Sequence, residues 1–503
     1  MPRFSSRSAR TASTIPRLAL GLATLGSIHS TTPTARAATH EVTNLADQNG
    51  IASVSRTCQE FATQSGGGIV VEPPPPKSTL SPISSTSLQA ALVAAASSGH
   101  KTIYLRGGFY ENPRTVELDG TFNDITLSAC PGETPVLSAP AHQPILALRG
   151  VHKFGLRGVA FEGPNPAGVL LENTTDCVIE QNLFLRPGTA IVLDTATSNV
   201  ISRNLIVHAD MSGIELKNRS NKNQLADNTI DGTAAPETHG GGIFVHGGDN
   251  NRISHNLIRN TAGFGIGISN WDSDTINIAN IVEYNRLQAT TLTAEDSGAI
   301  YILGRSGIDT QTIVAGNVID GVGSQNRHNV GIYLDDSTSG AVVTHNLIRR
   351  VGSDAVQIHG GSDNVVENNL LDLTEGNSSA ILFQSAPADT NPTNRQTGNV
   401  VERNVIILAD EASKLFVWLE GGTPQISNNL YASSSGMVKL SPPPLSDPRA
   451  RLADPVIVQD ALAGHYASAQ SAGIVVGFTP IDLAAAGPRE APAANTQTQP
   501  ASQ

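Results

Sequence analysis

The chain has 503 residues, of which 47 are glycine, 4% are aromatic and 15% are charged. One compact core rarely grows to this size, so the length predicts either several domains or a repetitive architecture. The net charge of −12 argues against nucleic acid or an anionic membrane surface as a partner, because both require a basic surface.

The first 37 residues have the features of an export signal. Arginines supply positive charge without any acidic residue, an apolar run follows at residues 18–26, and Ala35-Arg36-Ala37 offers a small-x-small cleavage site. The apolar run is too short to span a bilayer. We therefore expect residues 1–37 to be a removed signal peptide, and the mature protein to be periplasmic or secreted without insertion into a membrane.

Two segments precede the first expected strand, which lies at 102–105. Residues 38–86 contain Gly-rich and Pro-rich runs, which are typical of a weakly ordered leader. The stretch from Ser87 to Gly99 predicts a short amphipathic helix with Ser87 as its N-cap and Gly99 as its stop. We expect this helix to cover the exposed sheet edge at the N-terminal end.

The far end of the chain is rich in Ala, Pro, Gln and Thr. This composition predicts a disordered tail at residues 488–503. The folded body then spans residues 87–487 and includes a C-terminal capping segment.

The three cysteines are Cys58, Cys130 and Cys177. They are too few for a disulfide scaffold, and an odd number leaves at least one unpaired within the chain. Their positions leave open whether two of them pair. Buried, inert thiols are favoured over a zinc site, because none lies near a histidine cluster.

A short phrase that begins with Asn recurs at intervals from 22 residues (182 to 204) to 35 residues (369 to 404). Self-similarity at this period indicates a solenoid. Each repeat holds short alternating runs separated by Gly, Asn and Ser, which predicts strands and turns without helices. The sequence therefore predicts an all-β fold, a single right-handed parallel β-helix. The repeats begin at Asn182, Asn204, Asn228, Asn256, Asn285, Asn317, Asn346, Asn369, Asn404 and Asn429.

We assign this asparagine column a structural role. Asn tolerates the left-handed backbone of a turn, and stacked copies can hydrogen-bond from one coil to the next.

A second phrase, with a small residue followed by alternating apolar residues, recurs in each coil, as in "GIYLDD" at 331–336. Its second and fourth residues should point into the core and its third and fifth outward. Stacked strands lie about 4.8 Å apart, so each outward position forms a column of near neighbours. The third-position column reads Leu170, Val192, Glu215, Phe244, Gly267, Tyr301, Tyr333, Gln357 and Leu382, and the fifth reads Glu172, Asp194, Lys217, His246, Ser269, Leu303, Asp335, His359 and Gln384.

The middle of these columns gathers aromatic rings, carboxylates, amides and imidazoles. A sugar-binding groove requires this mixture, because rings stack on apolar sugar faces while polar groups bind hydroxyls. Tyr301 beside Tyr333 predicts an aromatic floor. The candidate substrate-binding residues are Tyr301, Tyr333, His359, His246, Glu215, Trp271 and Gln357.

Three aspartates are candidates for catalysis. Hydrolysis of a glycosidic bond generally takes two carboxyl groups, one as proton donor and one as base or nucleophile. Asp296 lies just ahead of one strand, and Asp335 and Asp336 end the strand of the next coil. This arrangement predicts a separation of about 5–10 Å, and such proximity raises one of the two pKa values.

Each candidate also has a structural explanation. Asp after a strand is a favoured turn residue. An outward histidine is as typical of a protein surface as of a site, and the tyrosines can simply pack across coils. Their concentration on the same few coils favours a site.

The stretches "DSGAIYILG" (296–304) and "VGIYLDD" (330–336) resemble bacterial right-handed β-helix proteins related to an α-L-fucosidase/xylanase glycoside hydrolase family, in the pectate-lyase-like superfamily. Similar flanking segments extend the resemblance over about residues 87–487. The resemblance implies catalytic aspartates at Asp296 and at Asp335 or Asp336, and Asp336 is preferred.

We therefore expect an exported, monomeric glycoside hydrolase that acts on a neutral or weakly charged polysaccharide or oligosaccharide, without cofactor or metal. A polysaccharide lyase or uronan epimerase is the first alternative. Such enzymes neutralise a uronate with calcium or with basic residues, and the outward columns offer only Lys217, with Arg305 just beyond a strand. A non-catalytic glycan-binding surface protein is the second alternative.

Overall fold

The computed structural model describes residues 58–64, 68–71, 73, 88–234, 240–269, 277–305, 308–323, 327–375, 379–386, 396–410, 413–439 and 445–490. The expected signal peptide, most of the expected leader, residues 491–503 and Trp271 lie outside these ranges. Among the described helices, none is long and apolar enough to cross a membrane.

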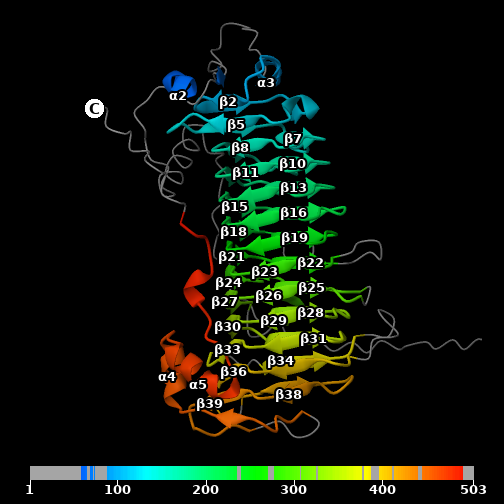
Figure 1. The fold of residues 1–503 in the computed structure, drawn as a ribbon, viewed down its shortest axis with the longest axis vertical. Helices are drawn as coiled ribbons and strands as arrows, with labels where there is room; N and C mark the ends of the chain where they lie inside the picture. Colours follow the sequence, from blue (N-terminus) through cyan, green and yellow to red (C-terminus); the bar gives the residue numbers. More distant parts are fainter. Residues whose placement is uncertain are drawn as a thin grey trace, which may run out of the picture.

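The described strands form three parallel sheets, here named A, B and C, which wind into a solenoid of about 13 coils (Figure 1). Each regular coil gives one strand to each sheet. Sheet A has 14 strands, in the order β1 (Ile69–Val71), β2 (Thr102–Leu105), β5 (Thr126–Ala129), β8 (Gly155–Arg157), β11 (Val178–Glu180), β14 (Val200–Ser202), β17 (Gln224–Ala226), β20 (Arg252–Ser254), β23 (Ile281–Glu283), β26 (Ile313–Ala315), β29 (Val342–Thr344), β32 (Val365–Glu367), β35 (Val400–Glu402) and β38 (Gln425–Ser427).

Sheets B and C follow the same order along the axis. Sheet B has 14 strands, which are β3 (Gly108–Glu111), β6 (Pro135–Ser138), β9 (Ala160–Glu162), β12 (Leu183–Leu185), β15 (Leu205–Ala209), β18 (Thr229–Thr233), β21 (Leu257–Thr261), β24 (Arg286–Thr290), β27 (Val318–Val322), β30 (Leu347–Val351), β33 (Leu370–Leu373), β36 (Val405–Leu408), β39 (Leu430–Ser433) and β40 (Arg451–Leu452). Sheet C has 12 strands, which are β4 (Val116–Leu118), β7 (Leu146–Arg149), β10 (Val169–Glu172), β13 (Ile191–Asp194), β16 (Ile214–Lys217), β19 (Gly241–His246), β22 (Phe264–Ser269), β25 (Ser297–Leu303), β28 (Asn329–Asp335), β31 (Asp354–His359), β34 (Ser379–Gln384) and β37 (Phe416–Trp418).

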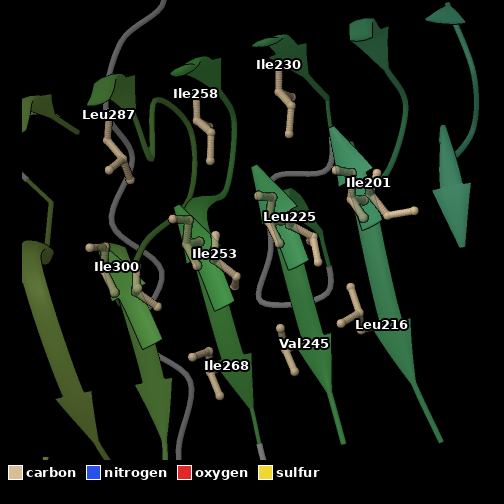
Figure 2. Packing of buried hydrophobic residues seen from close by; sticks show 14 of the residues in the cluster. Ile201, Leu216, Leu225, Ile230, Val245, Ile253, Ile258, Ile268, Leu287 and Ile300 are labelled. Carbon is tan, nitrogen blue, oxygen red and sulfur yellow. The ribbon is translucent and has the colours of Figure 1, made fainter. Parts of the chain in front are cut away.

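The interior is filled by aliphatic side chains stacked from coil to coil (Figure 2). Ile201, Leu225 and Ile253 occupy one such stack on sheet A, in register across three strands and fully buried. Burying one such side chain contributes about 1.5–3 kcal/mol. Because every coil repeats the pattern, the core is a continuous column that holds the strands of sheet C in fixed register.

The asparagine column forms a continuous hydrogen-bonded ladder, as predicted. In each coil the Nδ2 of the asparagine donates to the Oδ1 of the next one, for example from Asn285 to Asn317 at 3.0 Å and from Asn317 to Asn346 at 2.9 Å. The ladder runs from Asn182 to Asn429. It ends where Asn429 donates to the buried carboxylate of Asp447 at 3.0 Å.

The other reason given for these asparagines is wrong. The left-handed residue of each turn is the one before the asparagine, as at Gln181 (φ 56°), Arg203 (φ 54°) and Asp227 (φ 58°). Glycine is not required there, and residue types vary. Asparagine is therefore required at these positions for its side-chain hydrogen bonds and not for a left-handed backbone conformation.

The N-terminal end departs from the expected weakly ordered leader, and it answers the open question of cysteine pairing. Residues assigned to the weakly ordered leader form α2 (Cys58–Gln64) and β1, which pairs in parallel with β2. Cys58 forms a disulfide with Cys130, with the Cα atoms 5.4 Å apart. The prediction of inert thiols therefore holds only for buried Cys177, where burial raises the pKa of the thiol to about 11.

Helix α3 (Leu88–Ser97) lies within the range predicted for the first helix. Its Leu88, Leu92 and Ala95 are buried and join the main core. A short 3-10 helix, η1 (Gly120–Phe122), lies against it. Gly99 has a φ of +81°, which suits the residue that ends a helix. Ser87 lies outside the described residues.

The segment predicted to cap the C-terminal end contains two helices that pack beside the last coils. Helices α4 (Val456–Leu462) and α5 (Ala467–Gly473) pack on the outer face of the last strands of sheet B, which form an apolar cluster with them. The chain then turns back along sheet B through η2 (Ile474–Val476) and η3 (Leu483–Ala485), drawn red in Figure 1.

We name residues 474–490 the C-terminal strap. The ring Nδ1 of His255 lies 3.0 Å from the carbonyl oxygen of Ala485, and Arg489 donates to the buried carboxylate of Asp227 at 2.7 Å. The strap therefore ties the last coils to the middle of the solenoid and leaves the outer face of sheet C uncovered by it.

Candidate active site

The strand register of sheet C confirms the predicted columns. Tyr301 pairs with Tyr333, and Tyr333 pairs with Gln357, on the consecutive strands β25, β28 and β31. In the fifth-position column, Leu303 pairs with Asp335 and His359 with Gln384. The outward residues of these strands therefore lie side by side on one face.

Asp335 is the centre of a buried hydrogen-bond network. Its Oδ2 accepts from the hydroxyl of Tyr301 at 2.7 Å, and its Oδ1 lies 2.6 Å from Nδ1 of His359 and accepts from the backbone N–H of Asp336 at 2.8 Å. The residue is 6% exposed. Both carboxylate oxygens are thus occupied by protein groups, so Asp335 is suited to positioning its neighbours.

His359 is held between two carboxylates. Its Nδ1 also lies 3.7 Å from Oδ1 of Asp336. Burial alone would disfavour the charged imidazolium, but the hydrogen bond and charge of Asp335, with Asp336 and Asp296, outweigh burial and raise the pKa of His359.

Asp336 follows β28 and is largely buried, with its side chain 11% exposed. Its Oδ2 accepts from Nε of Arg305 at 3.0 Å. Burial and the adjacent Asp335 raise the pKa of Asp336, and Arg305 and His359 offset only part of that rise. A carboxyl group with a raised pKa keeps its proton to higher pH, as a proton donor must.

Asp296 has the opposite environment. Its side chain is 68% exposed, and its Oδ1 lies 2.9 Å from Nδ1 of His328 and accepts from the hydroxyl of Tyr333 at 3.1 Å. The hydrogen bond from His328 is the main cause that lowers the pKa of Asp296, and the hydroxyl of Tyr333 adds to it. The carboxylate is therefore ionised and open to solvent.

The prediction that Tyr301 and Tyr333 form an exposed aromatic floor is wrong, because both rings are buried. Tyr301 and Tyr333 are each 2% exposed and meet edge to face, with ring centroids 5.5 Å apart. They pack with Phe244 and Phe264 in a second apolar cluster on the outside of sheet C. The rings cannot stack on a sugar; instead, burial raises the pKa of both phenols, so their hydroxyls stay protonated and donate to the carboxylates.

His328 is a site residue that the sequence reasoning missed. Besides contacting Asp296, its Nε2 lies 2.6 Å from Oε1 of buried Gln357. The hydrogen bond with Asp296 is the main cause that raises the pKa of His328. A signal was available, because His328 precedes Tyr333 by the same number of residues as Asp296 precedes Tyr301.

Two predicted substrate-binding residues lie apart from this network. Glu215 is on β16, three strands from β25 and therefore about 14 Å along the axis. His246 is on β19 and stacks on Phe244 at 5.6 Å. Trp271 lies outside the described residues. The structure thus brings together Asp296, Tyr301, Tyr333, Asp335, Asp336, Gln357 and His359, with His328 and Arg305.

Asp335, Asp336 and His359 also offer possible metal-ligand atoms, all within 4.8 Å of one another. Protein groups already contact both carboxylate oxygens of Asp335 and Oδ2 of Asp336. Tyr301 and His359 contact Asp335, and Arg305 contacts Asp336. A cation would have to displace them, so the residues fit an internally neutralised cluster better than a resident metal. The absence of a metal requirement stays a prediction.

Comparison with known proteins agrees with the β-helix fold described above. A family profile described as "Right handed beta helix region" matches residues 167–338. None of the curated protein sequences matches this chain. Tailspike protein 3 of bacteriophage CBA120 is similar to the chain at 13% identity and a TM-score of 0.49, covering 79% of this chain and 69% of that one.

Two further solved structures are similar at the same level. The surface protein and adhesin PfbA of Streptococcus pneumoniae shares 12% identity at a TM-score of 0.44, over 72% of this chain and 94% of that one. The catalytic domain of a GH87 alpha-1,3-glucanase, solved with nigerose, shares 13% identity at a TM-score of 0.40, over 75% of this chain and 67% of that one. These likenesses carry no argument about function. The strand topology and the matching profile show that the described coils form one right-handed parallel β-helix.

Proposed function

We propose that the protein is a glycoside hydrolase in which Asp336 is the general acid and Asp296 is the base or nucleophile. One observation carries this proposal. Two carboxyl groups of neighbouring coils are linked through Tyr333, which donates to Asp296 and also hydrogen-bonds Asp335, the residue before Asp336. Yet the pKa values of Asp296 and Asp336 are shifted in opposite directions. Pairs of titratable groups whose environments separate their pKa values mark the acid and base of a reaction.

In this mechanism Asp336 donates its proton to the glycosidic oxygen as the bond from that oxygen to the anomeric carbon breaks. Asp296 either takes a proton from the attacking water or attacks the anomeric carbon itself. Asp335 positions the acid by holding Tyr301, His359 and the backbone N–H of Asp336. Tyr333 and His328 hold the base.

We also propose that the protein is exported and that α3 caps the N-terminal end of the solenoid. The Cys58–Cys130 disulfide supports export, because disulfides persist in oxidising compartments. The buried face of α3 supports the cap. The resemblance of the "DSGAIYILG" and "VGIYLDD" stretches to an α-L-fucosidase/xylanase family supports hydrolysis.

The proposal is tested by incubating the purified chain with a panel of aryl glycosides and of plant and bacterial polysaccharides. Hydrolysis should release reducing ends without ultraviolet absorbance and should persist in EDTA. Calcium-dependent release of unsaturated, absorbing products would instead show a lyase. Binding without turnover on any member of the panel would show a glycan-binding protein.

The pH dependence of turnover should identify the acid. Turnover needs Asp296 ionised and Asp336 protonated, and the pKa of the first lies below the ordinary value of 3.8 while that of the second lies above it. The rate should therefore be highest between the two values and fall as rising pH deprotonates Asp336. Arg305 lowers the pKa of Asp336, so Arg305→Met should move the alkaline limb to higher pH.

The measurement is kcat/KM across the acidic range for the native chain and Arg305→Met. Arg114→Met, at an exposed position in the first coils, is the matched control and should leave the profile in place. An alkaline limb that stays fixed in Arg305→Met would show that Asp336 is not the proton donor.

A further inference from the structure

A pocket of about 460 Å³ lies beside the proposed catalytic network, on the outer face of sheet C. His328, which contacts Asp296, forms part of its wall, and the pocket continues toward the last strands of the sheet. Leu382 and Val417, paired in register on β34 and β37, line it, as does exposed Leu419. Its volume is within the range of about 300–1,000 Å³ that small-molecule sites occupy.

The acidic group in this pocket is already satisfied within the protein. Asp354 is 7% exposed, its Oδ2 accepts from the hydroxyl of Ser353 at 2.5 Å, and its Oδ1 accepts from the hydroxyl of Ser379. Both oxygens are therefore engaged by serine hydroxyls.

The basic groups of the pocket have weaker ion pairs within the protein than Asp354 has hydrogen bonds. Lys414 is exposed, and no carboxylate within the described ranges forms an ion pair with its ammonium. Arg327 donates to the carbonyl oxygen of Thr293, and its ion pair with Glu295 is long, at 3.8 Å, with the Glu295 side chain 74% exposed. Such exposed pairs contribute little and exchange readily.

Several arginines elsewhere in the solenoid form closer ion pairs with acids on neighbouring strands, as in Arg186 with Glu162 at 2.7 Å and Arg259 with Asp231 at 2.6 Å. In a chain of net charge −12, a pocket that offers a lysine and an arginine favours an anion. Lysine attracts a carboxylate or sulfate as a point charge, and arginine binds it through a planar fork of donors.

We infer that this pocket is a subsite for an anionic sugar residue of the glycan, with Lys414 and Arg327 contacting its carboxylate or sulfate group and Leu382, Val417 and Leu419 contacting the apolar face of its ring. The inference rests on the proposed function for its assumption that the ligand is a glycan. It replaces the expectation of a neutral or weakly charged glycan. The outward columns did not reveal these cations, because Arg327 and Lys414 lie in the connections ahead of β28 and β37.

The inference is tested by calorimetry on the full chain carrying Asp336→Asn, so that binding is measured with the proposed acid removed. The probes are oligogalacturonate and oligomannuronate as carboxylated ligands, sulfated galactan oligosaccharides, and galactan oligosaccharides of the same length as the neutral ligand. Carboxylated or sulfated probes should bind at least about tenfold more tightly than the neutral one, and their affinity should fall as salt is raised.

Lys414→Gln and Arg327→Gln should each weaken binding of the anionic probe about tenfold or more, and should leave the neutral probe unchanged. Lys439→Gln, at an exposed lysine that does not line the pocket, is the matched control and should bind as the parent does. Preference for the carboxylated or for the sulfated probe identifies which anion the pocket takes. Equal affinity for anionic and neutral probes, or no effect of both substitutions, would overturn the inference.

The two proposals fail in different ways. Tight, salt-sensitive binding of an acidic oligosaccharide that the native chain never cleaves would uphold the pocket and reject the hydrolase. Turnover of neutral glycans that is insensitive to Lys414→Gln would uphold the hydrolase and reject the anionic subsite.

Discussion

Asp336→Asn is expected to lower turnover of an unactivated glycan by about 10³-fold or more, with little change in folding. Asparagine has the same shape and can still accept from Arg305, but it has no proton to give to the glycosidic oxygen. Asp296→Asn should cost at least as much, because it removes the exposed carboxylate that acts as base or nucleophile.

The two variants should be separable by the leaving group. An aryl glycoside with an acidic phenol leaves without protonation, so Asp336→Asn should keep most of its activity on that substrate, whereas Asp296→Asn should not. Asp210→Asn, at an exposed aspartate between β15 and β16, is the control and should match the native chain. Equal losses on both kinds of substrate in both variants would contradict the assignment of acid and base.

Asn317→Ala is expected to destabilise the solenoid by about 3–6 kcal/mol. The Asn317 side chain is fully buried, its Nδ2 donates to the carbonyl oxygen of Val282 and to Oδ1 of Asn346, and its Oδ1 accepts from the backbone and side chain of Asn285. Alanine would leave several of these buried groups without a partner, and no space is available for them to reach water.

The measurement is urea denaturation followed by circular dichroism, with hydrogen exchange to locate the weakened coils. Asn123→Ala is the matched control, since the half-buried Asn123 accepts from the backbone N–H of His152 near the surface. The control should lose less than about 1 kcal/mol. A loss in Asn317→Ala as small as that of the control would show that the ladder does not stabilise the fold.

The fold was predictable because its signals are local and repeated. The asparagine phrase gave the coil length, and the alternation in "GIYLDD" gave the direction of each side chain. The column order through Tyr301, Tyr333 and Gln357 follows from these two facts and is confirmed by the register. The disulfide was not predictable, because Cys58 and Cys130 are 72 residues apart and no repeat relates them.

The candidate site was predictable in position but not in environment. Alternation placed Tyr301 and Tyr333 outward, yet it could not show that they are buried in one apolar cluster with Phe244 and Phe264. Nor could it show that Asp335 is saturated by Tyr301 and His359, which is the observation that separates it from Asp336. Arg327 and Lys414 lie in connections whose paths the strand pattern does not determine.

The asparagine ladder has a direction. Every link donates from an Nδ2 toward the next coil, so the side-chain amide dipoles align along the axis, as peptide dipoles do in a helix. The donor end is at Asn429, and the negative charge placed there is the carboxylate of Asp447; at the opposite end, Oδ1 of Asn182 accepts from the backbone N–H of Val159. The carboxylate of Asp447 therefore lies at the positive end of the aligned side-chain dipoles, where a negative charge is most favourable.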